Sequence, residues 1–176
     1  MSSSTIVRPQ ADEHAPYYSK YIGRVPDGDL TSLLREQVDE TASLLRTVSP
    51  DQADFAYAPG KWTIKEVVGH MADVERVMAF RALWFARANN TELPGFDENT
   101  WALRAGAAHR TIPDLLEEFQ VVRSSTLHLA RHLSPEALAH RGTANGAPVS
   151  VRALFYIIAG HERHHVDLLR ERYLYH

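Results

Sequence analysis

Two histidines four residues apart near the C-terminal end could bind a metal ion. His161 and His165 continue an apolar pattern with steps of three and four residues, in positions where Leu or Ile would be expected on a helix facing a core. Residues four apart lie one turn above the other, with Cβ atoms about 5–6 Å apart, so both imidazoles can reach one ion. The alternative interpretation is a pair of hydrogen-bonded core histidines, because unpaired buried imidazoles are costly.

His70 is the candidate third ligand. It lies between Val67 and Val74 at the edge of another apolar stripe with helical spacing. Three imidazoles from two helices would leave coordination positions open for water or substrate, which is typical of a catalytic zinc site. Taken alone, however, His70 favours the simpler interpretation of a partly exposed helix histidine.

The segment 161–165, HERHH, also matches the H-E-x-x-H motif of zinc metalloproteases, in which the glutamate is the general base. The longer metzincin motif needs a glycine at position 168 and a histidine at position 171, where this chain has Leu168 and Glu171. Only eleven residues follow His165, which leaves little room for another helix that carries a ligand. Glu162 is therefore better interpreted as a flanking carboxylate than as a protease base.

Four long helices are predicted to position these histidines. Asp29 caps the first, which extends to about residue 48, and Thr63 with Glu66 forms a capping box at the start of the second, which extends to about residues 89–90. The third runs from Thr111 to about residue 133 and the fourth from Ser150 to about residue 173, with a short helix over 135–140. No alternating segment is long enough to require a sheet, and residues 142–148 predict at most a small turn.

Amphipathic helices of this number and length predict an all-α four-helix bundle. The roughly twenty residues over 91–110 are expected to cross the bundle between the second and third helices. Residues 1–28, broken by Pro9, Pro16 and Pro26, are expected to form an arm packed on the bundle, with 29–176 as the bundle and the whole chain as one domain.

Composition excludes several classes of chemistry. The chain of 176 residues contains no cysteine, which excludes disulfides, thiolate zinc sites, iron–sulfur clusters and a cysteine nucleophile. Nineteen Lys and Arg against twenty-two Asp and Glu give a net charge of −3, with no basic cluster, which argues against affinity for nucleic acid or an anionic membrane. Because no secretory signal or membrane span is evident, we expect a cytoplasmic protein.

The chain resembles the DinB/YfiT-like metalloenzyme family over about 150 residues. The residues that carry the resemblance are Arg8-Pro9, Glu13, the tyrosines over 18–21, the segment 60–73 (GKWTIKEVVGHMAD), the segment 94–97 (PGFD), the segment 160–165 (GHERHH) and Arg172-Tyr173. This family includes bacillithiol S-transferases and the metal-binding domain of mycothiol-dependent maleylpyruvate isomerase. The resemblance implies an up-down-down-up bundle, a divalent metal (nickel or zinc) on His70, His161 and His165, and a homodimer.

Our leading hypothesis is an enzyme, a metal-dependent thiol S-transferase that activates a low-molecular-weight thiol for attack on an electrophilic small molecule. One alternative is a hydrolase that uses metal-bound hydroxide, and the other is a stress-associated metal-binding bundle without catalysis. Metal-bound histidines usually need a partner for their second nitrogen, and the candidates for this role are Asp73, Glu66 and Glu162. Candidate pocket residues are Trp62, Phe96, Trp101, Tyr156 and His164.

Overall fold

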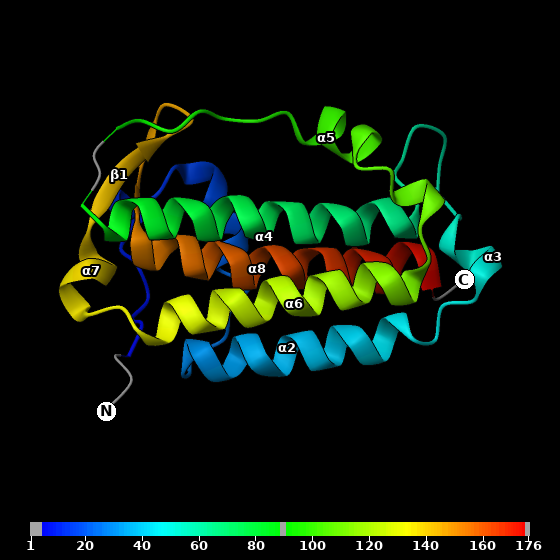
Figure 1. Cartoon of the computed structure of the whole chain (residues 1–176), viewed down its shortest axis with the longest axis horizontal. Coiled ribbons are helices and arrows are strands. Elements are labelled where there is room, and N and C mark those ends of the chain that lie inside the picture. The colour runs from blue at the N-terminus through cyan, green and yellow to red at the C-terminus, as the bar shows by residue number, and fades with distance from the viewer. Residues whose placement is uncertain (1–4, 89–90, 175–176) are drawn as a thin grey trace.

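Four long helices form the body of the molecule. The structure is a computed structural model that describes residues 5–88 and 91–174. The long helices are α2 (Leu30–Leu45), α4 (Ile64–Ala86), α6 (Ile112–Arg131) and α8 (Val151–Leu169). In chain order they run up, down, down and up. The helices α4 and α6 are parallel because the chain crosses the length of the molecule between them (Figure 1). The predicted all-α bundle is therefore confirmed.

Short elements connect and flank these helices. They are the 3-10 turns η1 (Ala11–Glu13), η2 (Pro16–Tyr18) and η3 (Ala107–His109), the helices α1 (Ser19–Ile22), α3 (Pro50–Ala53), α5 (Glu98–Arg104) and α7 (Pro135–Ala139), the π-helical turn η4 (Arg170–Leu174), and the strands β1 (Arg141–Ala144) and β2 (Ala147–Ser150). The crossover carries α5 and η3, and α5 packs on α4 (Figure 1). Within the described residues, no helix combines the length and apolarity needed to cross a membrane.

The helix starts follow local capping chemistry. Asp29 accepts a hydrogen bond from the Ser32 amide, and Ser150 accepts one from the Ala153 amide. Thr63 and Glu66 make the reciprocal bonds of a capping box at the start of α4. The helix ends differ more from expectation: α2 ends at residue 45 and α8 at 169, where the last turn changes to π geometry. The second helix was expected to extend to residues 89–90, which lie outside the described residues, and α4 ends earlier, at Ala86.

A β-hairpin forms where only a small turn was expected. Strands β1 and β2 pair antiparallel with Arg141 opposite Ser150, and Asn145-Gly146 makes the turn with positive φ at both residues. The backbone N–H of Asn145 donates to the Leu93 carbonyl, and this hydrogen bond fixes the start of the crossover to the hairpin. This pairing determines where residues 93–97 lie over the bundle.

A layer of buried polar side chains divides the core. One apolar cluster fills the end of the bundle near the hairpin, and the other fills the end near α3. Between them lie the buried polar residues Gln37, Thr41, His70, Glu75, Arg123, His161, Glu162 and His165. Because burying polar groups without partners is costly, this layer must be either internally paired or functional.

Candidate functional site

Three histidine side chains converge between α4 and α8. His70 comes from α4, and His161 and His165 come from successive turns of α8, which packs along α4. Nε2 of His161 lies 3.1 Å from Nε2 of His70 and 3.1 Å from Nε2 of His165. All three are buried, and their ligand nitrogens lie within 4.8 Å of one another. Within the described ranges, no other trio of His, Asp or Glu side chains converges in this way.

The two separations from His161 fit nitrogens bound to one metal ion. Two nitrogens that each lie about 2.0–2.1 Å from an ion, at tetrahedral or octahedral angles, are about 2.9–3.4 Å apart. The two separations of 3.1 Å from His161 fall within that interval. No carboxylate of the described residues forms an ion pair with any of the three rings, so the donor set is three imidazole nitrogens. Such a set suits zinc, nickel, copper or iron.

Burial keeps the three imidazoles in the neutral form that binds metals. It lowers the pKa of His70 to about 4, with a smaller effect from His164. For His161 and His165, burial and then the neighbouring imidazoles hold the pKa well below the usual range. At neutral pH each ring is therefore uncharged and carries one nitrogen lone pair, so no cationic imidazole has to lose a proton before a metal binds.

Aromatic contacts orient the rings. The indole of Trp62 lies 4.6 Å from the His70 ring, centroid to centroid, and Tyr21 meets His161 edge-on at 5.4 Å. His164 lies 5.0 Å from His165 and also contacts Tyr21. Nδ1 of His165 is buried without a hydrogen-bond partner in the described part of the chain. Packing, rather than a carboxylate, therefore holds this ring.

None of the three carboxylates expected to orient the ligands lies beside them. Glu66 accepts from the Thr63 amide and hydroxyl in the capping box. Asp73 pairs with Arg76, which also pairs with Glu118 of α6. Glu162 turns to the opposite side of α8, away from the cluster.

Glu162 belongs to a buried charge cluster behind the histidines. Its carboxylate accepts from the Thr41 hydroxyl at 2.7 Å and pairs with Arg123 at 2.8 Å. Arg123 also makes two hydrogen bonds of 2.8 Å to Glu75 and one of 2.7 Å to the Leu34 carbonyl. Burial raises the pKa of Glu162, and the Arg123 charge opposes that rise. These contacts hold the carboxylate away from the place that a general base of the zincin motif would need.

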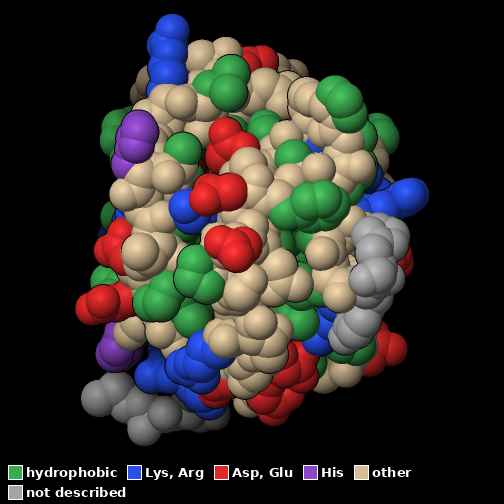
Figure 2. Space-filling model, turned by 90° about the vertical axis from the view of Figure 1, so that its right-hand side faces the viewer, with side chains coloured by type: hydrophobic (Ala, Val, Ile, Leu, Met, Phe, Trp, Pro, Cys, Tyr) green, Lys and Arg blue, Asp and Glu red, His purple; other side chains and the backbone are tan. Residues whose placement is uncertain are grey.

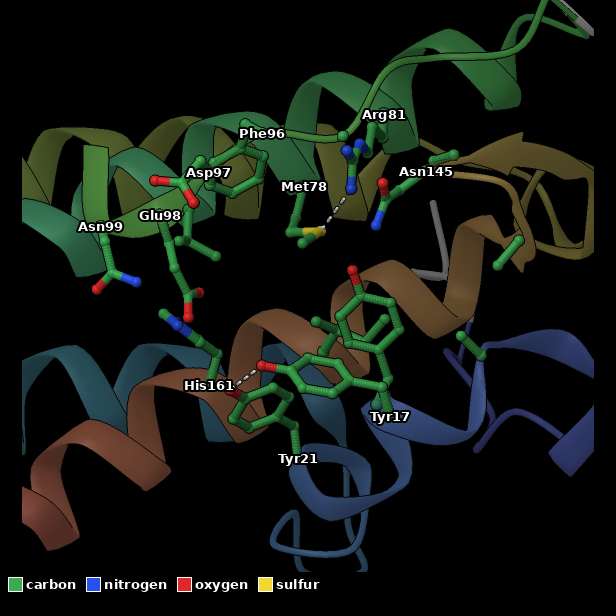
Figure 3. A pocket seen from close by; sticks show the side chains of 17 residues that line it. Tyr17, Tyr21, Met78, Arg81, Phe96, Asp97, Glu98, Asn99, Asn145 and His161 are labelled. Atoms are coloured by element: carbon green, nitrogen blue, oxygen red, sulfur yellow. Dashed lines mark hydrogen bonds between the residues drawn. The ribbon is translucent and has the colours of Figure 1, made fainter. Parts of the chain in front are cut away.

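A cavity of about 390 Å³ opens onto His161 (Figure 3). Its walls come from the N-terminal arm with its three tyrosines Tyr17, Tyr18 and Tyr21, from α4, from the crossover, from the hairpin turn and from α8. Glu98 projects into it from α5, on the side of His161 (Figure 3). A smaller cavity of about 200 Å³ reaches His165 and Trp62, and Asn99 lines both. The histidine cluster therefore lies between two openings under α5.

The expected pocket residues separate into two groups. Phe96 lines the larger cavity, Trp62 lines the smaller one, and His164 contacts the cluster. The Trp101 ring lies 4.7 Å from the Phe96 ring, centroid to centroid and tilted by 38°, but Trp101 remains 43% exposed. Tyr156 lies elsewhere, with its hydroxyl donating to the Ile6 carbonyl and Arg8 over its ring.

Sequence reasoning missed Arg81, Glu98 and Asn145. A signal for Arg81 was present, because it continues the apolar stripe of Val74 and Met78 in steps of four and three and is buried. Glu98 and Asn145 gave no such signal, since only the crossover and the hairpin bring them to the cavity.

Comparisons with known proteins agree with this architecture. Residues 33–169 match the DinB superfamily. A protein of Geobacillus thermodenitrificans, provisionally named a metal-dependent hydrolase, is 28% identical over 141 residues, which are 75% of each chain. Bacillus subtilis YfiT, described as a four-helix bundle and provisionally as a metal-dependent hydrolase, superposes with a TM-score of 0.66 at 18% identity, covering 93% of this chain and 92% of its own. The mycothiol-dependent maleylpyruvate isomerase also gives 0.66, at 17% identity, over 84% of this chain and 62% of its own.

Proposed function

This chain belongs to the DinB superfamily, and we propose that His70, His161 and His165 hold a divalent metal, nickel or zinc, for a reaction on a small molecule. The observation that carries the proposal is the convergence of three buried, neutral imidazole nitrogens beside an open cavity. When bound, a divalent metal lowers the pKa of a coordinated thiol or water and so supplies a nucleophile near neutral pH.

The chain's own residues supply the rest of the chemistry. Trp62 and Tyr21 hold the His70 and His161 rings in place. Phe96 and the tyrosines of the arm form an apolar wall that reduces the access of water to one side of the cavity. Glu98 is the carboxylate that faces the cavity near His161, and we assign it the role of accepting the proton released by the nucleophile.

The nucleophile that we favour is a low-molecular-weight thiol. The chain contains no cysteine, so a sulfur nucleophile would have to arrive with a small molecule. The likeness to a mycothiol-dependent isomerase supports a thiol cosubstrate. Hydrolysis by an activated water is the second candidate, and the provisional names of the Geobacillus protein and of YfiT favour it.

Elemental analysis tests the metal site. Protein purified without an affinity tag from metal-replete cells should carry about one equivalent of nickel or zinc, and His70→Ala should lose it. His128→Ala is the matched control, because His128 lies exposed on α6 away from the cluster and should leave the metal content unchanged. Metal-free wild-type protein under these conditions would overturn the proposal.

Two assays on the metal-loaded protein separate the nucleophiles. Thiol transfer predicts conjugation of monochlorobimane to a cysteinyl thiol and no turnover of 4-nitrophenyl acetate without thiol. Hydrolysis predicts turnover of 4-nitrophenyl acetate without thiol and no conjugation of monochlorobimane. Glu98→Gln should slow whichever reaction occurs by about 10²-fold or more while the metal content stays constant. Metal binding with neither activity in a broad screen would favour the non-catalytic bundle.

The family resemblance also suggests a homodimer. Exposed apolar side chains on α4, Phe80 at 51% and Leu83 at 40%, are compatible with such an interface. Light scattering coupled to size-exclusion chromatography measures the assembly directly, and a monomer at micromolar concentration would contradict this part of the proposal.

A further inference from the structure

Arg81 is a buried cation without a carboxylate partner. It lies on α4, is 4% exposed and lines the larger cavity. Its Nη2 donates to the Pro94 carbonyl at 2.8 Å, and its Nη1 lies 3.8 Å from the sulfur of Met78. Within residues 5–88 and 91–174 it forms no ion pair with an Asp or Glu.

The contrast with Arg123 shows why this is unusual. Arg123, equally buried, has two carboxylates and a carbonyl as partners. A guanidinium has five N–H donors, and Arg81 uses one on the Pro94 carbonyl and one weakly on the Met78 sulfur. Its other contacts are with neutral groups, a hydrogen bond to the Tyr18 side chain and the Phe96 ring 5.9 Å from its Cζ. Buried charges are normally paired because their desolvation is expensive. An anionic group of a molecule bound in the cavity could therefore pair with Arg81.

Two neutral groups stand beside the guanidinium. Asn145 lies in the hairpin turn, and a Cβ on Gly95 would come within 2.1 Å of its amide oxygen, so the glycine makes room for this side chain. The amide nitrogen of Asn145 points into the cavity (Figure 3). The phenol of Tyr18 also lines the cavity, and burial raises its pKa although the Arg81 charge opposes the rise, so it stays a hydrogen-bond donor at neutral pH.

We propose that Arg81, assisted by Asn145 and Tyr18, binds a carboxylate group of the substrate, so that the cavity selects small molecules with an acid at one end. Arg81 lies across the cavity from His161, which leaves the other end of such a molecule near the histidine cluster (Figure 3). This inference rests on the proposed function only in assigning the reaction to the His161 end. The carboxylate site itself needs no metal.

The surrounding charges favour a carboxylate over a phosphate. One guanidinium and neutral donors match the single charge and planar shape of a carboxylate, which accepts two parallel N–H bonds. Asp97 and Glu98 line the same cavity and would repel a dianion more than a monoanion. The volume of about 390 Å³ suits a compact organic acid.

Matched ligands test the charge preference. Calorimetric titration of the full-length protein with 3-phenylpropionate, 3-phenylpropanamide and phenyl phosphate should show the carboxylate binding about tenfold or more tightly than the amide, and more tightly than the phosphate. Arg81→Gln should abolish the difference between carboxylate and amide. Arg87→Gln, at the exposed end of the same helix, should retain it. Equal affinities in the wild type, a tighter phosphate, or an unchanged preference in Arg81→Gln would each overturn the proposal.

A second variant and two further measurements keep the test independent of folding and of the metal. If Arg81→Gln does not fold, Asn145→Gly keeps the positive-φ turn and should weaken carboxylate binding about threefold. In the wild type, NMR signals of the Arg81 side chain and the Asn145 amide should shift on adding 3-phenylpropionate, and unshifted signals contradict the site. Repeating the titration after EDTA treatment should preserve the preference. A preference lost with the metal would assign the carboxylate to the histidine cluster instead. Wild-type protein that carries no metal as purified, but still shows the preference, would contradict only the proposed function.

Discussion

At the scale of single residues, the H-E-x-x-H match is a coincidence of helical spacing. His161 and His165 face α4, whereas Glu162, 100° around the helix from His161, faces α2 and α6, where it meets Thr41 and Arg123. Adjacent residues on a helix point in different directions, so the residues of this motif lie on two sides of α8. The histidines line the cavity side, and the glutamate closes a charge cluster in the core.

The charge cluster predicts a graded loss of stability. Arg123→Met should lower the free energy of unfolding by about 3–5 kcal/mol, because it leaves Glu75 and Glu162 buried without a cation. Glu162→Gln should lower it by only about 1 kcal/mol, since Glu75 keeps its two bonds to Arg123 and the amide can still accept from Thr41. Urea denaturation followed by circular dichroism measures both.

Metal content and activity of the Glu162→Gln variant test whether Glu162 has only a structural role. Glu162→Gln should keep its metal and its turnover, since the carboxylate touches none of the three histidines. A variant of normal stability and metal content whose turnover fell by orders of magnitude would contradict this interpretation and restore the general-base role for Glu162.

At the scale of elements, the sequence predicted what local chemistry decides. Thr63 and Glu66 lie three residues apart and cap α4 through their own bonds, so the start of that helix was predictable. The hairpin was not, because strands of four residues carry little alternation and are held by pairing with each other and with Leu93. The contacts of Asn145 with the cavity depend on that long-range pairing.

The candidate site divides in the same way. His161 and His165 were predictable because their spacing on one helix fixes their direction. The partner of Glu162 was not, because Arg123 comes from a helix about forty residues earlier and its position depends on how α6 packs. Spacing within a helix was therefore enough to select the candidate metal ligands, whereas the cavity walls required the tertiary structure.

Close contact between α1 and α8 predicts different outcomes for two glycines. A Cβ on Gly160 would lie 2.0 Å from the Tyr21 carbonyl oxygen, so Gly160→Ala should lower the free energy of unfolding by about 1–3 kcal/mol and displace Tyr21 from His161. Gly69→Ala is the control in α4, where the new methyl would meet Ala107 at 3.5 Å. It should be neutral or stabilising by up to about 1 kcal/mol. Thermal unfolding compares them, and equal effects would contradict the contact.

At the scale of the whole molecule, function and stability share one polar layer. The histidine cluster and the Arg123 charge cluster lie between the two apolar halves of the core, which therefore do not merge into one. On the end of the bundle that carries α3, acidic and basic side chains of the described residues are interspersed without a broad patch of either sign (Figure 2). The histidine cluster and the Arg123 charge cluster thus lie inside the molecule, and the cavity lies under the arm and the crossover.

The arm that covers the cavity is attached to the bundle through a buried carboxylate. Glu13 is 1% exposed, accepts a hydrogen bond of 2.7 Å from Arg152 of α8, and accepts another from the Gln10 amide. Burial alone would raise the pKa of Glu13, but these bonds outweigh it and lower the pKa to about 2. Because the arm also contributes Tyr17, Tyr18 and Tyr21 to the cavity, its attachment affects the site.

This attachment predicts a defined dependence on pH. In the unfolded chain Glu13 protonates near its ordinary pKa of 4.5, and in the folded protein near 2, so between these values the unfolded state binds more protons and stability rises with pH. The contribution is complete above about pH 5 and lost as the pH falls to 2. Glu13→Gln should therefore lower the free energy of unfolding by about 1–3 kcal/mol at pH 7 and by much less at pH 2.

The control is Asp12→Asn, which breaks an exposed pair with Arg141 and should change the free energy of unfolding by less than about 0.5 kcal/mol at either pH. Urea denaturation of the three proteins between pH 2 and 7 measures the difference, and a loss in Glu13→Gln that did not vary with pH would show that packing, rather than the charge, attaches the arm.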